Sequence, residues 1–101
     1  MELTGKQKRH LKGLGHGQKP LVLVGKDGIT DALIRQIDDC LLAHELVKVK
    51  ALEGCPMPRR ELAQALSTAT ASALVQVLGR TLLIYRPHPE SPSIRLPGEK
   101  N

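Results

Sequence analysis

The chain has 101 residues, of which 41% are hydrophobic and 25% are charged, a composition typical of a single globular domain. Its 15 lysine and arginine residues outnumber 10 acidic residues, so the formal net charge is +5, which favours polyanionic partners and says nothing about fold. There is no phenylalanine, no tryptophan and one tyrosine, Tyr85, so RNA modules that stack bases on aromatic rings of a sheet are nearly excluded.

Targeting signals are not apparent. No run of about 18 apolar residues occurs, so we expect no membrane-spanning helix. Residues 1–6 lack the apolar core of a secretory signal. We therefore expect a cytoplasmic protein, in which Cys40 and Cys55 do not form a disulfide.

The first predicted helix follows Thr4 and carries much of the positive charge. Thr4 and Gln7 have the spacing of a capping box, and Gly15 is expected to end the helix. Residues 3–26 contain no acid and six basic residues, and so hold the whole positive excess of the chain: Lys6, Lys8, Arg9, Lys12, Lys19 and Lys26. This confinement favours an anion-binding surface over a merely solvated helix face.

The next junction is the feature most informative about chemistry. An apolar strand, 21–24, runs into Gly-Lys-Asp-Gly at residues 25–28, and Thr30 is placed to cap a second helix over 31–44. Glycines let a polyanion approach the backbone, and the first turn of a helix offers unpaired N–H groups. The junction predicts a phosphate-binding loop, although a tight strand-to-helix turn explains the same four residues equally well.

The rest of the chain completes a sheet. Residues 46–52 alternate as a strand with Lys48 and Lys50 on its outer face, and strands 74–78 and 82–85 flank a hairpin turn. Because a helix joins the first two strands, we expect them to be parallel. The order α-β-α-β-α-β-β predicts an α/β (α+β) domain with a mixed four-stranded sheet packed by helices.

The third helix and the tail are the less regular parts. Pro58 suits the first position of that helix, whose buried stripe is expected to be Leu62, Ala65, Leu66 and Ala69. Residues 87–101 hold four of the seven prolines and are expected to be extended, anchored by Ile94 and Leu96.

Neither catalysis nor metal binding is indicated. Cys40 and His44 have helical spacing, but no CxxC or HxxxH accompanies them and zinc sites need four ligands. The histidines are dispersed, and neither a nucleophile elbow nor a Walker loop is present. We therefore expect no enzyme, no metal and no cofactor.

Several separated motifs, in the right order, resemble the bacterial YhbY family, the stand-alone form of the CRM (chloroplast RNA splicing and ribosome maturation) domain. Residues 6–14 resemble its opening K-Q-K-x-H-L-K-G-L, residues 19–20 and 25–30 its K-P…G-x-x-G-x-T, and residues 44–50 its H-E-L-[IV]-K-V-K. Residues 76–81, 85–87 and 94–97 resemble its Q-V-I-G-[KR]-T, Y-R-P and I-x-L-P.

The resemblance implies an RNA-binding protein that associates through rRNA with precursors of the large ribosomal subunit and assists their assembly. It implies a fold similar to the C-terminal domain of translation initiation factor three. We expect one CRM domain over residues 1–97, a disordered end at 98–101, and a monomer. The expected RNA-binding residues, extended to neighbouring basic positions, are Gly25, Lys26, Asp27, Gly28, Lys6, Lys8, Arg9, Lys12, Lys19, Lys48, Lys50, Arg80 and Arg86.

Alternatives remain for the function and for single residues. A basic module that docks an acidic protein, or a DNA-binding protein, would share the same charge. Lys48 and Lys50 serve equally well as solubilising residues, and Arg86 as a partner for a carboxylate. Asp27 would repel phosphate unless it turns away, and Arg59 and Arg60 fall in a stretch with little family signal.

Overall fold

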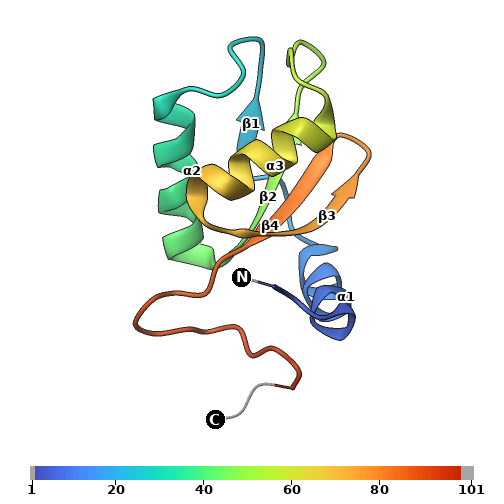
Figure 1. Ribbon diagram of the computed structural model, residues 1–101, viewed down its shortest axis with the longest axis vertical. Helices are drawn as coiled ribbons and strands as arrows, with labels where there is room; N and C mark the ends of the chain where they lie inside the picture. The colour runs from blue at the N-terminus through green and yellow to red at the C-terminus, as the bar shows by residue number, and fades with distance from the viewer. Residues whose placement is uncertain (1, 99–101) are drawn as a thin grey trace.

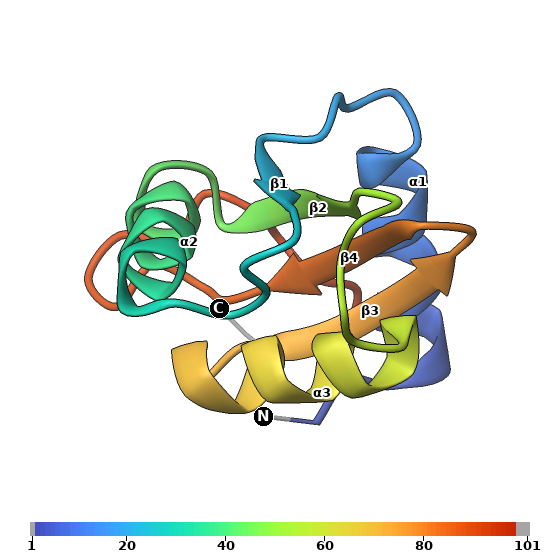
Figure 2. The same ribbon diagram turned by 90° about the horizontal axis from the view of Figure 1, so that it is seen from above.

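A mixed four-stranded sheet forms the centre of the molecule, and helices cover both of its faces (Figure 1 and Figure 2). The computed structural model describes residues 2–98. Its elements are α1 (Gly5–Gly15), β1 (Val22–Val24), α2 (Asp31–His44), β2 (Leu46–Ala51), α3 (Arg59–Thr70), β3 (Ala73–Leu78) and β4 (Thr81–Tyr85). Helices α2 and α3 pack on one face, and α1 with the C-terminal tail packs on the other. The expected fold class is confirmed.

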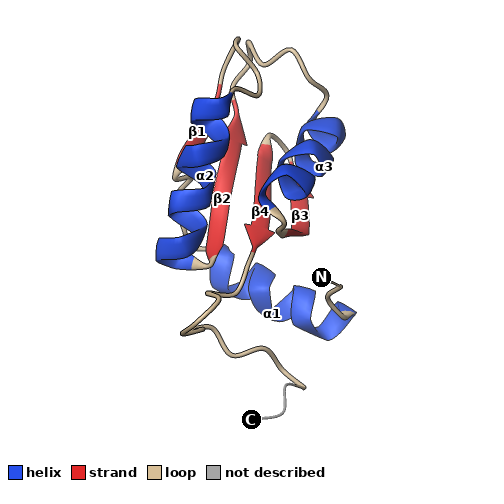
Figure 3. Ribbon diagram, turned by 60° about the vertical axis from the view of Figure 1, so that its left-hand side comes forward, coloured by secondary structure: helices blue, strands red, loops and turns tan. Residues whose placement is uncertain are grey.

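The strand order is β1-β2-β4-β3, as Figure 3 shows. Strand β1 is parallel to β2, with α2 as the crossover between them, whereas β4 is antiparallel to both β2 and β3. The predicted parallel pair and the predicted hairpin are therefore both present. The central place of β4 does not follow from element order, because a hairpin can join a sheet through either of its strands.

The larger core lies between the sheet and helices α2 and α3. Every second residue of β1 and β2 points into it, which includes Val22, Val24, Val47 and Val49. Burying one such aliphatic side chain contributes about 1.5–3 kcal/mol. This core fixes the angle at which β1 leaves the sheet and enters the Gly-Lys-Asp-Gly loop.

A smaller core lies under α1 and the tail. It contains Leu11 from α1, Leu46 and Tyr85 from the sheet, and Leu96, with Ile94 packed against it. The predicted anchoring of the tail by Ile94 and Leu96 is thus confirmed. Tyr85 is 1% exposed, so this ring fills the core and is not available to stack on a base.

Gly15 ends α1 as expected, but for a different reason. Its backbone is not in the left-handed conformation of a glycine helix cap; the positive-φ glycines of the described chain are Gly28, Gly79 and Gly98. A Cβ atom on Gly15 would lie 2.8 Å from Leu83 Cδ2. The absence of a side chain therefore lets the end of α1 approach the sheet.

The predicted buried face of α3 was only partly correct, because the helix is rotated relative to the expected orientation. Leu62 and Leu66 are buried as expected, but Ser67 and Thr70 are buried in place of the exposed Ala69. A sequence pattern based on apolar residues could not find this face, because two of its members are polar. Pro58 is the N-cap and not the first helical residue.

Glu45 ties the tail to the end of α2. Its Oε1 accepts hydrogen bonds from the backbone N–H groups of Ser93 and Ile94, at 2.8 Å each, and its Oε2 accepts one from His88 at 2.7 Å. Burial alone would raise the pKa of the Glu45 carboxyl, but the three N–H donors stabilise the carboxylate and lower that pKa below its ordinary value. Of the end that we expected to be disordered, residues 99–101 lie outside the described residues.

Arg86 is a structural residue. Its guanidinium donates to Asp38 Oδ1 at 2.8 Å and to the backbone carbonyl of Thr70 at 2.7 Å, and so joins α2 to the end of α3. We expected Arg86 on the RNA-binding surface, and we withdraw it, because three of its five N–H donors are held by α2 and the end of α3. The alternative role as partner of a carboxylate is the one that the structure shows.

In the part of the chain that the structure describes, no helix has the length and apolarity needed to cross a membrane.

Candidate nucleic-acid interface

The Gly-Lys-Asp-Gly loop, residues 25–28, is an exposed turn between the end of β1 and the start of α2. The N–H of Gly28 donates to the carbonyl of Gly25 at 3.1 Å and closes the turn. Thr30 then caps α2, as predicted, because its Oγ1 accepts from the N–H of Leu33 at 3.1 Å. The loop therefore presents the positive end of the α2 dipole beside two glycines.

The two glycines differ in what the fold requires of them. Gly28 is buried, has φ of +63°, and would place a Cβ 3.3 Å from Pro56 Cγ. Gly25 has an ordinary backbone, and its nearest neighbour would be Leu52 Cδ1 at 3.9 Å. Gly28 is thus needed for the turn itself, whereas the open space at Gly25 is free for a ligand.

Lys26 and Asp27 both point into solvent at the tip of the loop. Both are exposed, and within residues 2–98 neither has a hydrogen bond or an ion pair. Lys26 can therefore reach a phosphate from the tip. Asp27 does not turn into the protein, so it opposes an anion at close range and limits how a phosphate can approach.

The loop that connects β2 to α3, residues 52–58, lies beside this turn (Figure 1). The N–H of Leu52 donates to the carbonyl of Val24 at 2.8 Å, and a Cβ on Gly54 would lie 3.7 Å from Lys26 Cβ. Because of this contact, the start of α3 is held at the same end of the sheet as the Gly-Lys-Asp-Gly turn.

Three arginines join Lys26 at this end. Arg59 and Arg80 line one shallow depression, and Arg59 and Arg60 line the next, beside the hairpin turn at Gly79. All three arginines are exposed, and no ion pair of theirs occurs among the described residues. We call Lys26, Arg59, Arg60 and Arg80 the loop-end cations.

Arg59 and Arg60 were not among the expected RNA-binding residues, although the sequence carried a signal for them. Cations in the first turn of a helix oppose its dipole and weaken it. Such a cost indicates a use other than helix stability. Motif matching could not find these residues, since the stretch around them resembles no family motif.

The other expected basic residues lie on the α1 side of the sheet. Lys48 and Lys50 project from β2 to this side, because Leu46, two and four residues earlier, belongs to the small core under α1. Lys48 also donates to the carbonyl of Gln18 at 2.9 Å and so holds the segment that follows α1. We call Lys6, Lys8, Arg9, Lys12, Lys19, Lys48 and Lys50 the helix-side cations.

The two groups of cations are continuous at Lys50. Lys50 pairs with Leu23, the residue before the last one of β1, and with Thr81, the first residue of β4. Both partners therefore lie near the loop end of the sheet. Successive same-face residues of a strand are about 6.6 Å apart, which is close to the spacing of phosphates along a nucleic-acid strand. The sheet thus links Lys48 and Lys50 to Arg80, whose carbonyl accepts from the N–H of Ala51 at 2.8 Å, whereas α1 lies toward the other end of the sheet (Figure 3).

Acidic residues are unevenly distributed. Helix α1 has no acidic residue, and Asp38 and Asp39 of α2 lie on the opposite face of the sheet. The loop end carries both signs, because acidic residues lie there beside the loop-end cations: Asp27, Asp31, Glu53 and Glu61. The α1 side of the sheet is therefore the positive side of the molecule.

The structure offers no support for a metal at Cys40 and His44. No group of three or more potential ligands occurs among the residues that the structure describes. Partial burial, and then the negative charge of Asp39, raise the pKa of the Cys40 thiol. A raised pKa disfavours the thiolate, which is the form that binds metals.

Comparisons with known proteins agree with the fold and with the motifs. The model of the CRS1/YhbY (CRM) domain matches residues 3–86. The chain is 42% identical to the probable RNA-binding protein YqeI of Bacillus subtilis, over 94% of this chain and 99% of that protein. It is 38% identical to a protein of Haemophilus influenzae named as an RNA-binding protein, over 94% of this chain and 95% of that one.

A solved structure gives the same result. The solution structure of a hypothetical protein from Staphylococcus aureus, described as a putative RNA binding protein, superposes with a TM-score of 0.80. That protein is 48% identical in sequence, and the match covers 95% of this chain and 100% of the other.

The proteins that share this small α+β domain are named RNA-binding proteins. The chain belongs to the CRS1/YhbY (CRM) domain family.

Proposed function

We propose that this protein binds RNA, and that it associates through rRNA with precursors of the large ribosomal subunit and assists their assembly in the cytoplasm. We further propose that it acts as a monomer and without catalysis. Its relatives are named RNA-binding proteins. The observation that carries the proposal is the set of cations on α1, β2 and the loop end, none of which has an ion pair among the described residues.

The mechanism is a backbone clamp. The open space at Gly25, the adjoining N–H groups at the start of α2 and the Lys26 ammonium hold one phosphate. The helix-side and loop-end cations then follow the RNA backbone in two directions. Since Tyr85 is buried, aromatic stacking by tyrosine contributes nothing, and affinity comes mainly from phosphate contacts and RNA shape.

Binding by such a clamp has a characteristic salt dependence. Each neutralised phosphate releases counterions, so the logarithm of the association constant falls by about 0.7 per phosphate for each tenfold rise in salt on single strands. Five contacts give a slope of about −3.5.

The test is a fluorescence anisotropy titration of the full chain with labelled RNA hairpins over a range of salt concentrations, with a DNA duplex of matched length as the comparison. We expect a slope of about −3 or steeper and tighter binding to the RNA. Binding that is independent of salt, or equal for RNA and duplex DNA, would refute the clamp.

An acidic protein partner is the second candidate, because the same basic surface would attract it. The two candidates separate in a lysate. A protein partner stays bound after ribonuclease treatment, whereas an RNA partner is lost.

A further inference from the structure

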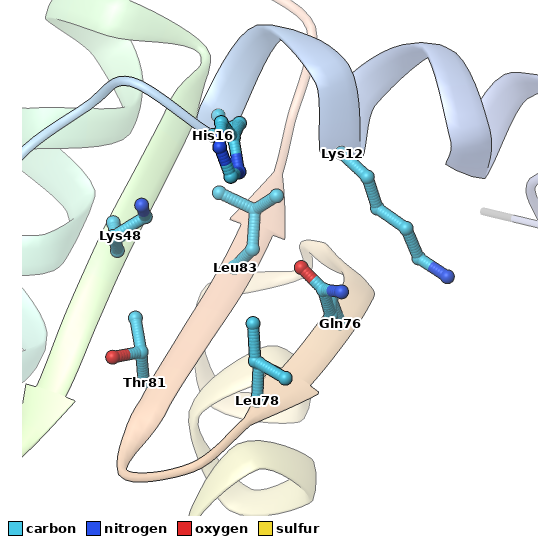
Figure 4. Close-up of a pocket in the computed structure, with 8 residues that line it drawn as sticks. Lys12, His16, Lys48, Gln76, Leu78, Thr81 and Leu83 are labelled. Atoms are coloured by element: carbon cyan, nitrogen blue, oxygen red, sulfur yellow. The ribbon is translucent and has the colours of Figure 1, made fainter.

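A hollow on the α1 side of the sheet adjoins the helix-side cations (Figure 4). Leu83 of β4 lies at its centre and is 3% exposed, and Leu78 of β3 forms a wall and is 65% exposed. The hollow begins where α1 ends, because Gly15 rests on Leu83 and the sheet beyond it is uncovered. Its base is therefore apolar and part of the rigid sheet.

Polar side chains surround this apolar base. Gln76 is opposite Leu83 on β3, and Thr81 is opposite Leu78 on β4, so two cross-strand rows place an amide and a hydroxyl at the rim. His16 stands beside Leu83 from the end of α1, as Figure 4 shows. Among the described residues, none of these three side chains has a hydrogen-bond partner.

The charged groups at the rim are all basic. Lys12 and Lys48 line the hollow from α1 and β2, and the lining contains no acidic residue among the described residues. Lys48 donates one hydrogen bond to the carbonyl of Gln18, which leaves two of its three donors free. The rim therefore attracts an anion, while the base offers apolar contact.

We propose that this hollow holds one unpaired nucleotide of the bound RNA, with its base over Leu83 and Leu78 and its phosphates near Lys12 and Lys48. The proposal rests on the proposed RNA binding and adds base recognition to a clamp that otherwise contacts only phosphates. The Gln76 amide supplies a donor and an acceptor to the edge of the base, the Thr81 hydroxyl supplies a third contact, and the His16 ring stacks on its face.

The chemistry of the hollow distinguishes a nucleotide from simpler ligands. A bare anion would make no favourable contact with the two leucines of the base, and an apolar ligand would leave the polar groups of Gln76 and Thr81 without partners. A nucleobase has apolar faces and a polar edge, and it carries its own negative charge on the adjoining phosphate. It is the ligand class that satisfies all the groups present.

The first test is an NMR titration of the isotope-labelled full chain with the four nucleoside 5′-monophosphates, and with inorganic phosphate as the control. We expect at least one nucleotide to shift the side-chain amide signals of Gln76 and the methyl signals of Thr81 and Leu78, with phosphate alone leaving them unchanged. Equal shifts with phosphate, or no shifts at these groups, would overturn the proposal.

The second test uses single-stranded RNA homopolymers and variants that change no charge. Gln76→Leu and Thr81→Val should each lower the affinity for the preferred homopolymer several-fold and weaken the preference, with the salt slope unchanged. Gln64→Leu, an exposed glutamine on α3, is the matched control and should bind like the wild type. Fold is checked from the amide NMR spectrum of each variant.

The two failures are distinct. If the wild type prefers no homopolymer, or if the Gln76 and Thr81 variants keep its affinity and preference, base recognition in the hollow is wrong while the clamp stands. If the wild type binds no RNA but nucleotides still shift the signals of the hollow, the proposed function fails and the nucleotide site remains.

Discussion

At the scale of single residues, the fold requires one glycine of the Gly-Lys-Asp-Gly turn, Gly28, and leaves open space at the other, Gly25. The sequence predicted the turn and its capped helix, but it could not tell the two glycines apart, because the difference depends on Pro56, which is 28 residues away from Gly28 in the chain. A glycine required by a positive φ is expected whatever the protein binds. A glycine with an ordinary backbone and open space around it needs another explanation, and a close ligand supplies one.

We therefore expect Gly25→Asp to weaken RNA binding by about tenfold or more, or about 1.4 kcal/mol, with the fold intact. The carboxylate would occupy the phosphate position and add a second negative charge beside Asp27. Anisotropy with an RNA hairpin measures the affinity, and circular dichroism the fold.

Ala43→Asp is the control for that variant. Ala43 is exposed near the end of α2, so the substitution makes the same charge change away from both the turn and the helix-side cations. If both variants lost affinity equally, the turn would have no special role. Substituting Gly28 would not serve, since its φ of +63° makes any side chain strained.

Glu45 provides a pH test at the residue scale. Its pKa is lowered in the folded protein, so its stabilising contribution is fully present above the unfolded value of about 4.5 and is lost as the pH falls through the folded value. At pH 7 we expect Glu45→Gln to reduce the free energy of unfolding by about 2 kcal/mol, since hydrogen bonds to a charged group are lost.

Urea unfolding at pH 7 and at pH 3 measures this effect. The difference between wild type and Glu45→Gln should shrink at the lower pH, where the wild-type carboxyl becomes protonated. A difference that stayed constant with pH would mean that the carboxylate charge does not hold the tail.

At the scale of elements, α2 was predictable to its ends and α3 was not. Helix α2 has an apolar stripe and a threonine cap, and both are local signals. Helix α3 buries Ser67 and Thr70, and its N-cap makes no side-chain hydrogen bond. Thr70 donates to the carbonyl of Leu66 at 2.7 Å, a contact that only the folded helix reveals.

Ser67 of α3 is expected to destabilise the fold. Its buried Oγ has no hydrogen-bond partner among the described residues, and leaving a buried polar group unpaired costs about 1–3 kcal/mol. Ser67→Ala should therefore increase the free energy of unfolding by about 1 kcal/mol. Thermal and urea unfolding of the variant measure it.

Thr68→Ala is the control for helix propensity, because Thr68 is exposed on the same helix. Alanine favours any helix by a few tenths of a kcal/mol, roughly, over serine or threonine. If Ser67→Ala increased the free energy of unfolding no more than Thr68→Ala, the unpaired Ser67 hydroxyl would not destabilise the protein.

At the scale of the whole molecule, the basic residues of the α1 side come from segments far apart in sequence. The sequence placed the positive excess in residues 3–26, but only the fold shows that Lys48 and Lys50 of β2 lie on the same side of the sheet as α1. Arg86 matches a family motif, but its guanidinium is paired with Asp38. A motif match therefore identified Arg86 without revealing this partner, which is 48 residues away in the chain.

The loop-end cations give a charge-reversal prediction. Arg59→Glu should weaken RNA binding and reduce the size of the salt slope by about 1, as expected for the loss of one phosphate contact. The variant should not unfold the protein, because a glutamate in the first turn of α3 favours the helix dipole. Arg35→Glu, on the exposed side of α2, is the control. If it lost as much RNA affinity as Arg59→Glu, the loss would reflect the net charge of the protein and not a contact made by Arg59.

The most direct test of the central claim is sedimentation of a cell lysate on a sucrose gradient, at low and moderate salt, with and without ribonuclease, followed by immunodetection of the protein. We expect the protein to migrate with particles just lighter than the mature large subunit, and moderate salt and ribonuclease each to release it. A protein that stays at the top of the gradient in every condition, or one that migrates with particles after ribonuclease treatment, would contradict RNA-mediated association with these precursors.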